Sequence, residues 1–329
     1  MNDGHNRRIN YLRISVTDRC NLRCVYCMPK EGVSLAGHSD ILRYEEILRL
    51  VKVAVKLGIT KIRITGGEPL VRRGIADFVA AVSAIDGVEE ISLTTNGILL
   101  PRLAQPLFDA GIRRINISMD SLKAARYAQI TGGGDLATLW EGIRAAQEAG
   151  FTPLKLNTVA IKNFNDDEVL DFAQLAWEND LQVRFIEFMP LGGTKLGEFI
   201  SNDDLQATIM TRYRLQELPP LDNDSRGPAQ LFAIEGGKGK IGFISPLSHT
   251  FCAHCNRLRL TSFGSLRACL LNDAEVNIRE ALRGGCSAEE LEAIIREVIA
   301  QKPREHCLTT SSAGNFWRKC QREMFQIGG

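Results

Sequence analysis

The chain has 329 residues, 44% apolar and 24% charged, which is typical of a globular protein with a sizeable buried core. Its formal net charge of +1 gives no overall attraction to nucleic acid or to a membrane surface, so neither is expected as a partner. No signal peptide and no bilayer-spanning apolar stretch is seen, which predicts a cytoplasmic protein. Nine cysteines in a reducing compartment then indicate metal or cluster chemistry rather than disulfides.

Short β-rich runs alternate with amphipathic helical patterns through the first 190 residues. The helical patterns include Glu45–Leu57, and Leu136–Ala149 with Asp135 as its N-cap and Gly150 at its end. This alternation predicts an α/β fold, a parallel sheet curved into a partial (β/α)6 barrel of the TIM type, with an open doubly wound sheet as the alternative. The predicted strands are Arg13–Thr17, Lys61–Thr65, Ile91–Thr95, Ile115–Met119, Lys155–Ile161 and Val183–Met189.

The pattern changes after Pro190-Leu191-Gly192-Gly193, where strands and helices no longer alternate. We predict a barrel domain over residues 1–198, a C-terminal α+β domain over 199–320, and a polar tail over 321–329 that ends in Gly328-Gly329. The elements expected in the second domain are helices at Asn202–Arg212, Asn277–Leu282 and Ala288–Ile299, and strands at Gln230–Ile234, Lys240–Ser245 and Arg257–Thr261.

The first cysteine group, Cys20, Cys24 and Cys27, has the spacing C-x3-C-x2-C and directly follows the first predicted strand. Three thiolates on one short loop can hold three irons of a [4Fe–4S] cluster and leave the fourth iron open to a small chelating ligand. A structural zinc site with His38 as a distant fourth ligand is the alternative, but these cysteines lie closer together than zinc spacing requires.

The second group, Cys252, Cys255 and Cys269, has the spacing C-x2-C-x13-C. Zinc is a more serious alternative here, because His249 or His254 could complete a four-ligand site. A second [4Fe–4S] cluster with an open iron is the favoured interpretation. The remaining cysteines, Cys286, Cys307 and Cys320, are scattered and are expected to be small semi-buried side chains.

Basic residues recur in strands that should be buried on both faces. Lys61 and Arg63 are two positions apart and therefore point to one face, and Arg257 and Arg259 repeat that spacing. Any one of these cations could pair with an internal acid such as Glu187 or Asp120. As a set they predict a positively charged barrel lumen for an anionic, phosphate-bearing ligand; the others are Arg13, Lys155 and Arg184.

The segment from Cys20 to Cys27, with the sequence C-N-L-R-C-V-Y-C, resembles the signature of the radical S-adenosylmethionine (SAM) enzymes. Gly66-Gly67-Glu68-Pro69 is similar to the loop that lies along the methionine part of SAM in that family. The resemblance implies that SAM chelates the open iron and that one electron cleaves it to a 5′-deoxyadenosyl radical. The positions that match SAM contacts are Tyr26, Gly67, Ser118 and Met189.

The second cysteine group, the run from Cys255 to Arg259 and the terminal Gly-Gly resemble the GTP 3′,8-cyclase family over essentially the whole chain. This implies that a second cluster binds the purine, that hydrogen is taken from C3′ of GTP, and that the C3′ radical attacks C8. The product would be (8S)-3′,8-cyclo-7,8-dihydroguanosine 5′-triphosphate, the first intermediate of the molybdenum cofactor. Implied catalytic residues are Arg13, Arg257 and Arg259; implied GTP contacts are Arg13, Lys61, Arg63, Thr94, Lys155, Arg184, Asn256, Arg257, Leu258 and Arg259.

The implied partners are GTP, SAM, a flavodoxin- or ferredoxin-like electron donor and, by pathway, a downstream cyclic pyranopterin monophosphate synthase. The sequence leaves open the reductant, the choice between monomer and homodimer, and the identity of the purine. One alternative function is a radical SAM enzyme that modifies a peptide and carries an auxiliary cluster. A nucleic-acid-binding module is a second alternative, which the near-zero net charge and the aromatic content of 7% disfavour.

Overall fold

The computed structural model describes residues 1–28, 37–189, 191, 198–219, 227–306 and 323–328. The predicted features at Pro190, Gly192, Gly193, Cys307, Cys320 and Gly329 lie outside these ranges. Within them, no helix is long and apolar enough to span a bilayer.

Six parallel strands in chain order form the inner wall of the protein, as predicted. Adjacent strands are joined in register, and the segment between each pair carries at least one helix. The sequence placed each strand within two residues of its observed position. Their bounds are β1 Tyr11–Ser15, β2 Lys61–Thr65, β3 Glu90–Thr95, β4 Arg114–Ser118, β5 Leu154–Ala160 and β6 Leu181–Glu187.

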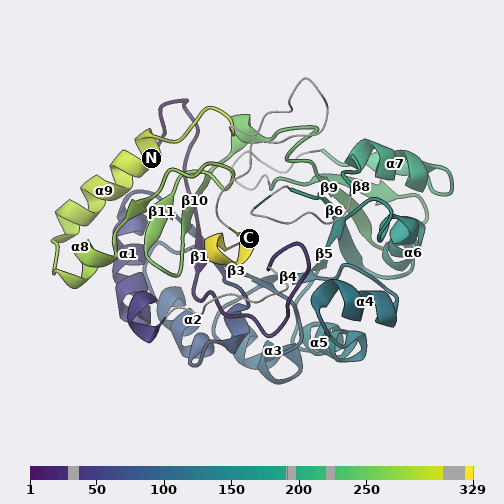
Figure 1. The fold of residues 1–329 in the computed structure, drawn as a ribbon, viewed down its shortest axis with the longest axis horizontal. Helices are drawn as coiled ribbons and strands as arrows, with labels where there is room; N and C mark the ends of the chain where they lie inside the picture. The colour runs from purple at the N-terminus through teal and green to yellow at the C-terminus, as the bar shows by residue number, and fades with distance from the viewer. Residues whose placement is uncertain (29–36, 190, 192–197, 220–226, 307–322, 329) are drawn as a thin grey trace.

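The helices of this region cover the outer, convex side of the curved sheet (Figure 1). That arrangement is a partial barrel and not a doubly wound sheet, so the favoured prediction is confirmed. Asp135 caps α5 as predicted, because its carboxylate accepts hydrogen bonds from the N–H groups of Ala137 and Thr138. The bounds are α1 Tyr44–Lys56, α2 Ile75–Ser83, α3 Leu100–Asp109, α4 Ala124–Thr131, α5 Leu136–Glu148 and α6 Val169–Glu178, with 3-10 turns η1 His38–Asp40, η2 Pro69–Val71 and η3 Asp166–Glu168.

The strands after residue 198 extend the barrel sheet at both of its edges. β9 pairs in parallel with β6, and β10 pairs in parallel with β1. Over the described residues, the strand order is β12-β11-β10-β1-β2-β3-β4-β5-β6-β9-β8-β7 in one sheet. The bounds are α7 Asn202–Met210, β7 Leu215–Glu217, β8 Gln230–Ile234, β9 Lys240–Ile244, η4 Cys252–His254, β10 Arg257–Leu260, β11 Ser265–Arg267, β12 Val276–Asn277, α8 Arg279–Arg283, α9 Ala288–Ala300 and α10 Met324–Ile327.

Two details differ from the sequence expectation. The helix predicted from Asn277 begins at Arg279, because Val276 and Asn277 pair with β11 as strand β12. The division into domains at residue 198 stays a proposal: the sheet is continuous across it, and each half of the chain supplies part of the same wall.

Glu187 joins the two halves of the chain at the end of β6. Its carboxylate is fully buried and accepts hydrogen bonds from the N–H groups of Asn202 (3.3 Å), Leu247 (3.0 Å) and Ser248 (3.1 Å), and from the Ser248 hydroxyl. The suggestion that Glu187 neutralises a barrel arginine is therefore wrong. The carboxylate instead holds the start of α7 and the segment after β9 against the barrel.

We expect Glu187→Ala to lower the free energy of unfolding by roughly 3 kcal/mol, because it leaves buried N–H groups without an acceptor. The measurement is urea unfolding of the metal-free protein, followed by circular dichroism. Glu187→Gln keeps one acceptor oxygen and should lose less. Equal midpoints for the unchanged protein and Glu187→Ala would contradict this role.

Candidate active site

The first cysteine group lies on the loop after β1, which is pinned to the end of α4. The N–H groups of Arg23 and Val25 donate to the carbonyls of Thr131 (2.8 Å) and Ile130 (2.9 Å). Burial raises the pKa of Cys24 and Cys27, and the neighbouring thiols raise it further, so the three sulfurs share one site. Buried thiols that resist ionisation until a cation arrives suit an iron–sulfur cluster.

The loop after β2 packs against the cysteine loop with almost no clearance. A Cβ on Gly67 would lie 2.5 Å from the Arg19 carbonyl oxygen, so only glycine fits there. Glu68, which burial gives a raised pKa of about 7, accepts hydrogen bonds from Thr95 Oγ1 (2.7 Å) and from the N–H group of Asn96 (2.7 Å). The Asn96 side chain in turn lies 3.8 Å from Cys20 Sγ, so the loops after β1, β2 and β3 form one unit.

Tyr26 is fixed by the end of β4. Its hydroxyl donates to Asp120 Oδ2 (2.7 Å), and Asp120 Oδ1 accepts from the N–H group of Val159 (2.8 Å). Asp120 therefore orients the cysteine loop rather than neutralising a barrel arginine, and that interpretation is wrong for Asp120 as well as for Glu187.

The second cysteine group surrounds the β10–β11 hairpin. Burial raises the pKa of Cys252, and the nearby thiols of Cys269 and Cys255 contribute, which places these three sulfurs together. For Cys255, the charges of Arg257 and Lys302 outweigh burial and lower the thiol pKa to about 7.

The zinc alternative for this group finds no support in the geometry. His249 Nε2 is bound to Asp203 Oδ2 at 2.9 Å, on the exposed surface. Among the described residues, no three Cys, His, Asp or Glu side chains converge tightly enough for a single ion. Cysteines of a cluster bind different irons and so stand further apart than the ligands of one zinc.

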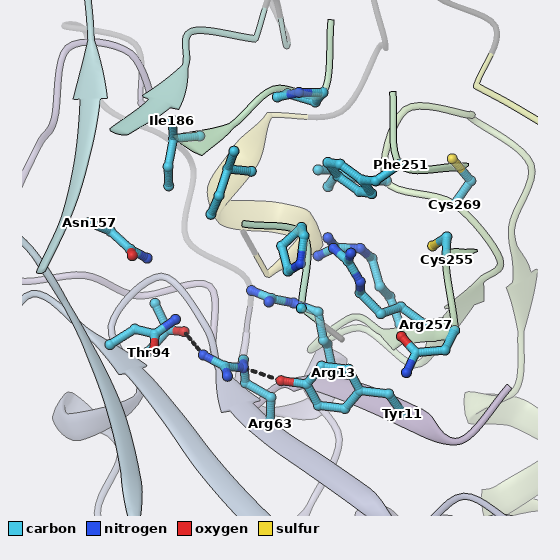
Figure 2. Close-up of a pocket in the computed structure, with 18 of the residues that line it drawn as sticks. Tyr11, Arg13, Arg63, Thr94, Asn157, Ile186, Phe251, Cys255, Arg257 and Cys269 are labelled. Carbon is cyan, nitrogen blue, oxygen red and sulfur yellow. Dashed lines mark hydrogen bonds between the residues drawn. The ribbon is translucent and has the colours of Figure 1, made fainter. Parts of the chain in front are cut away.

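A cavity of about 240 Å³ lies inside the barrel and reaches the second cysteine group. Figure 2 shows Cys255 and Cys269 on one side of it, Asn157 and Ile186 on the other, and Arg13 and Arg63 between. Among the described residues that line it, Glu90 is the one carboxylate, and it is bound to Arg114 at 2.7 Å. Eight cations line the same cavity: Arg13, Lys61, Arg63, Arg114, Lys155, Arg184, Arg257 and Arg259.

The closeness of these basic side chains to one another lowers the pKa of several of them. Burial, and then the charges of Arg184, Arg114 and Arg63, lowers the pKa of Lys155 to about 6. The pKa of Arg184 falls to about 9 for the same reasons. Arg184, Asn116 and Asn157 line the cavity, and the buried Nε of the arginine and side-chain oxygens of the two asparagines have no hydrogen-bond partner among the described residues. The lining thus suits a polyanion with several hydrogen-bonding groups.

The tail lies between the two cysteine groups. Helix α10 sits inside the arc of strands (Figure 1). The backbone of Phe325 lies close to the Cys27 thiol and counteracts part of the rise in its pKa, while Ile327 packs in one apolar cluster with Cys269. The Gly328 carbonyl accepts a hydrogen bond from Arg259 (2.8 Å), and a Cβ at Gly328 would meet Thr65 Oγ1 at 2.7 Å.

The structure brings together most side chains that the sequence singled out. The cavity lining includes every proposed GTP contact except Leu258, whose side chain is in the apolar core, and it also includes Met189. Tyr26 and Gly67 belong to the first cysteine site, and Ser118 ends β4. Lining residues that sequence reasoning missed include Tyr11, Arg114 and Asn157. Tyr11 and Asn157 each stand two positions from a predicted cation, so the alternation of a strand could have found them.

Comparison with known proteins agrees with this geometry. The family model of the radical SAM superfamily matches residues 14–176, and that of Molybdenum Cofactor Synthesis C matches residues 181–308. A GTP 3′,8-cyclase of Moorella thermoacetica is 51% identical over 331 residues, and one of Alkaliphilus oremlandii is 47% identical over 332, each alignment covering 100% of both chains. The chain belongs to the GTP 3′,8-cyclase family. Its cofactors are accordingly those of a radical SAM enzyme, SAM and [4Fe–4S] clusters, which the cysteine groups fit.

Two similar solved structures show the same fold at low identity. SuiB of Streptococcus suis, bound to its precursor peptide SuiA, matches with a TM-score of 0.61 at 15% identity, over 92% of this chain and 73% of that one. The enzyme anSMEcpe with bound AdoMet matches with a TM-score of 0.58 at 14% identity, over 89% and 81%. At such identity these likenesses concern the fold alone.

Proposed function

We propose that this chain converts GTP to (8S)-3′,8-cyclo-7,8-dihydroguanosine 5′-triphosphate, the first step of molybdenum cofactor biosynthesis. The observation that carries the proposal is that one three-cysteine group borders a cation-lined cavity, while α10 lies between that group and the other one. A peptide substrate gives no reason for eight lining cations, so the peptide-modifying alternative is not favoured.

The residues divide the work between the two sites. Cys20, Cys24 and Cys27 hold the cluster that binds SAM, and Cys252, Cys255 and Cys269 hold the one that faces the purine. When bound, SAM and its cluster supply the radical that takes hydrogen from C3′, while the open iron of the other cluster offers the purine a ligand position. The SAM contacts we assign are Tyr26, Gly67, Ser118 and Met189.

The triphosphate is assigned to the part of the cavity around Arg63. The guanidinium of Arg63 is already held in place for this role, because it donates hydrogen bonds to the Tyr11 hydroxyl and to Thr94 Oγ1 (3.1 Å) (Figure 2). Lys61, Lys155 and Arg184 supply further charge. Asn256 and the backbone of Leu258 complete the set of predicted contacts, since the Leu258 side chain faces the core.

Arg13, Arg257 and Arg259 are proposed as the catalytic residues. Arg13 and Arg259 are direct neighbours in the β1–β10 register, and Arg257 stacks on Phe251 with its guanidinium carbon 4.8 Å from the ring centre. Arg13 and Arg257 lie between Cys255 and the rest of the cavity (Figure 2), and Arg259 lines the same cavity. These positions suit the three arginines to hold the nucleotide while charge and radical move within it.

The cellular setting is part of the same proposal. We place the enzyme in the cytoplasm, because all seven described cysteines are free thiols, which a reducing compartment preserves. A flavodoxin- or ferredoxin-like protein would donate electrons, and a cyclic pyranopterin monophosphate synthase would consume the product.

Nucleotide binding should take up about one proton at pH 8, because a triphosphate raises the low pKa of Lys155 and restores its ammonium. Affinity should therefore weaken as pH rises above about 6, the pKa of Lys155 in the free protein. Titration calorimetry of GTP in buffers of different ionisation enthalpy measures the uptake. Lys155→Arg stays charged throughout and should show no uptake from this position. Equal uptake by both proteins would contradict the assignment.

Neutralising Arg257 or Arg259 with Gln should lower cyclised product on the order of 100-fold, as expected when one preorganised transition-state contact is lost. Formation of 5′-deoxyadenosine should continue largely unchanged, because the first cysteine group is untouched. Both products are quantified by chromatography after anaerobic reaction with SAM, GTP and dithionite. Equal loss of both would instead indicate a structural role for these arginines.

A further inference from the structure

Lys302 places a buried ammonium group at the second cysteine site. The residue follows α9, and its side chain is 3% exposed. Nζ donates to the carbonyl oxygens of Arg257 (2.8 Å) and Ala268. These carbonyls lie two residues after Cys255 and one residue before Cys269, so Lys302 joins the two arms of the cysteine hairpin.

Both carbonyls belong to the segments that carry Cys255 and Cys269, and the charge of Lys302 helps to lower the pKa of the Cys255 thiol. An ammonium has three N–H donors, and two of them bind these carbonyls. Burial disfavours the charged form of Lys302, and the nearby thiolates of Cys255 and Cys269 favour it. A buried cation of this kind needs an anionic partner, and a thiolate-ligated cluster is one.

The N-terminal segment holds Lys302 in place. Arg7 is buried, forms an ion pair with Asp3 (2.6 Å), and donates to the carbonyls of Cys252 (2.8 Å) and Pro303 (2.7 Å). It therefore fixes the chain next to Lys302 against the loop that carries Cys252. Neither Arg7 nor Lys302 is among the described residues that line the nucleotide cavity, whereas Cys252, Arg257 and Ala268, whose carbonyls they bind, are.

We propose that Lys302 is a positioning residue of the second cluster: its buried ammonium holds the two arms of the cysteine hairpin together and raises the cluster's reduction potential. A positive charge close to the ligand sulfurs favours the reduced, more negative cluster. Lys302 thereby sets the redox state that the nucleotide meets. This inference rests on the proposed function, because it requires a cluster at the second cysteine group.

The test uses the full-length chain carrying Cys20→Ala, Cys24→Ala and Cys27→Ala, so that the second cluster is observed alone. Redox titration followed by electron paramagnetic resonance compares this background with the same chain carrying Lys302→Met. We expect a shift of the midpoint to more negative potential. Lys302→Arg keeps the charge and should recover part of the shift, whereas Lys52→Met, which removes an exposed lysine on α1, should cause none.

Two further arms separate the outcomes. If Lys302→Met retains no cluster, Lys302→Gln replaces it, because Gln keeps N–H donors without the charge. In the reciprocal background, Cys252→Ala with Cys255→Ala and Cys269→Ala, the first cluster should keep its potential when Lys302 is changed. An unchanged second-cluster potential overturns the inference alone. Zinc in place of iron in the first background overturns the proposed function, and this inference with it.

Discussion

Repulsion between like charges on neighbouring strands is the constraint on which this structure depends. Arg259, Arg13 and Arg63 stand directly beside one another on β10, β1 and β2, at the spacing of about 5 Å between paired strands. Like charges so placed are destabilising. The Gly328 carbonyl and the cysteine thiolates relieve part of this field. We propose that an anionic nucleotide relieves it further, so that the fold itself favours the binding of a polyanion in this cavity.

This constraint explains why the two halves of the chain share one sheet. β10 brings Arg257 and Arg259 next to β1, while β9 continues the wall beyond β6. The second cysteine group therefore enters the barrel together with its arginines, on a strand fixed by backbone hydrogen bonds. The tail then connects the sites, with Phe325 at Cys27 and Ile327 near Cys269. Each site is incomplete without residues from the distant part of the chain.

Local patterns predicted the barrel strands and much of the site. The two-residue spacing of Lys61 and Arg63 indicated a shared inward face, and the cysteine spacings indicated clusters. The sequence could not predict that β10 pairs with β1, because this pairing joins residues about 250 positions apart and leaves no local pattern. The sequence suggests Glu187 and Asp120 as acids that could pair with arginines, because it does not reveal that their carboxylates accept hydrogen bonds from backbone N–H groups. Leu258 fails as a side-chain contact through strand alternation, which turns it toward the core. In the sequence, Lys302 is an ordinary lysine near the end of a helix. Only the fold shows that its ammonium lies beside the segments that carry Cys255 and Cys269.

The central claim is that each of the two cysteine groups holds a cluster, and counting iron tests it most directly. The intact protein and a Cys252→Ala/Cys255→Ala/Cys269→Ala variant are reconstituted anaerobically, and iron, sulfide and zinc are measured per chain. The account predicts about eight irons in the intact protein and about four in the variant, one [4Fe–4S] cluster having been lost. About four irons and one zinc in the intact protein, with only the zinc lost in the variant, would contradict it.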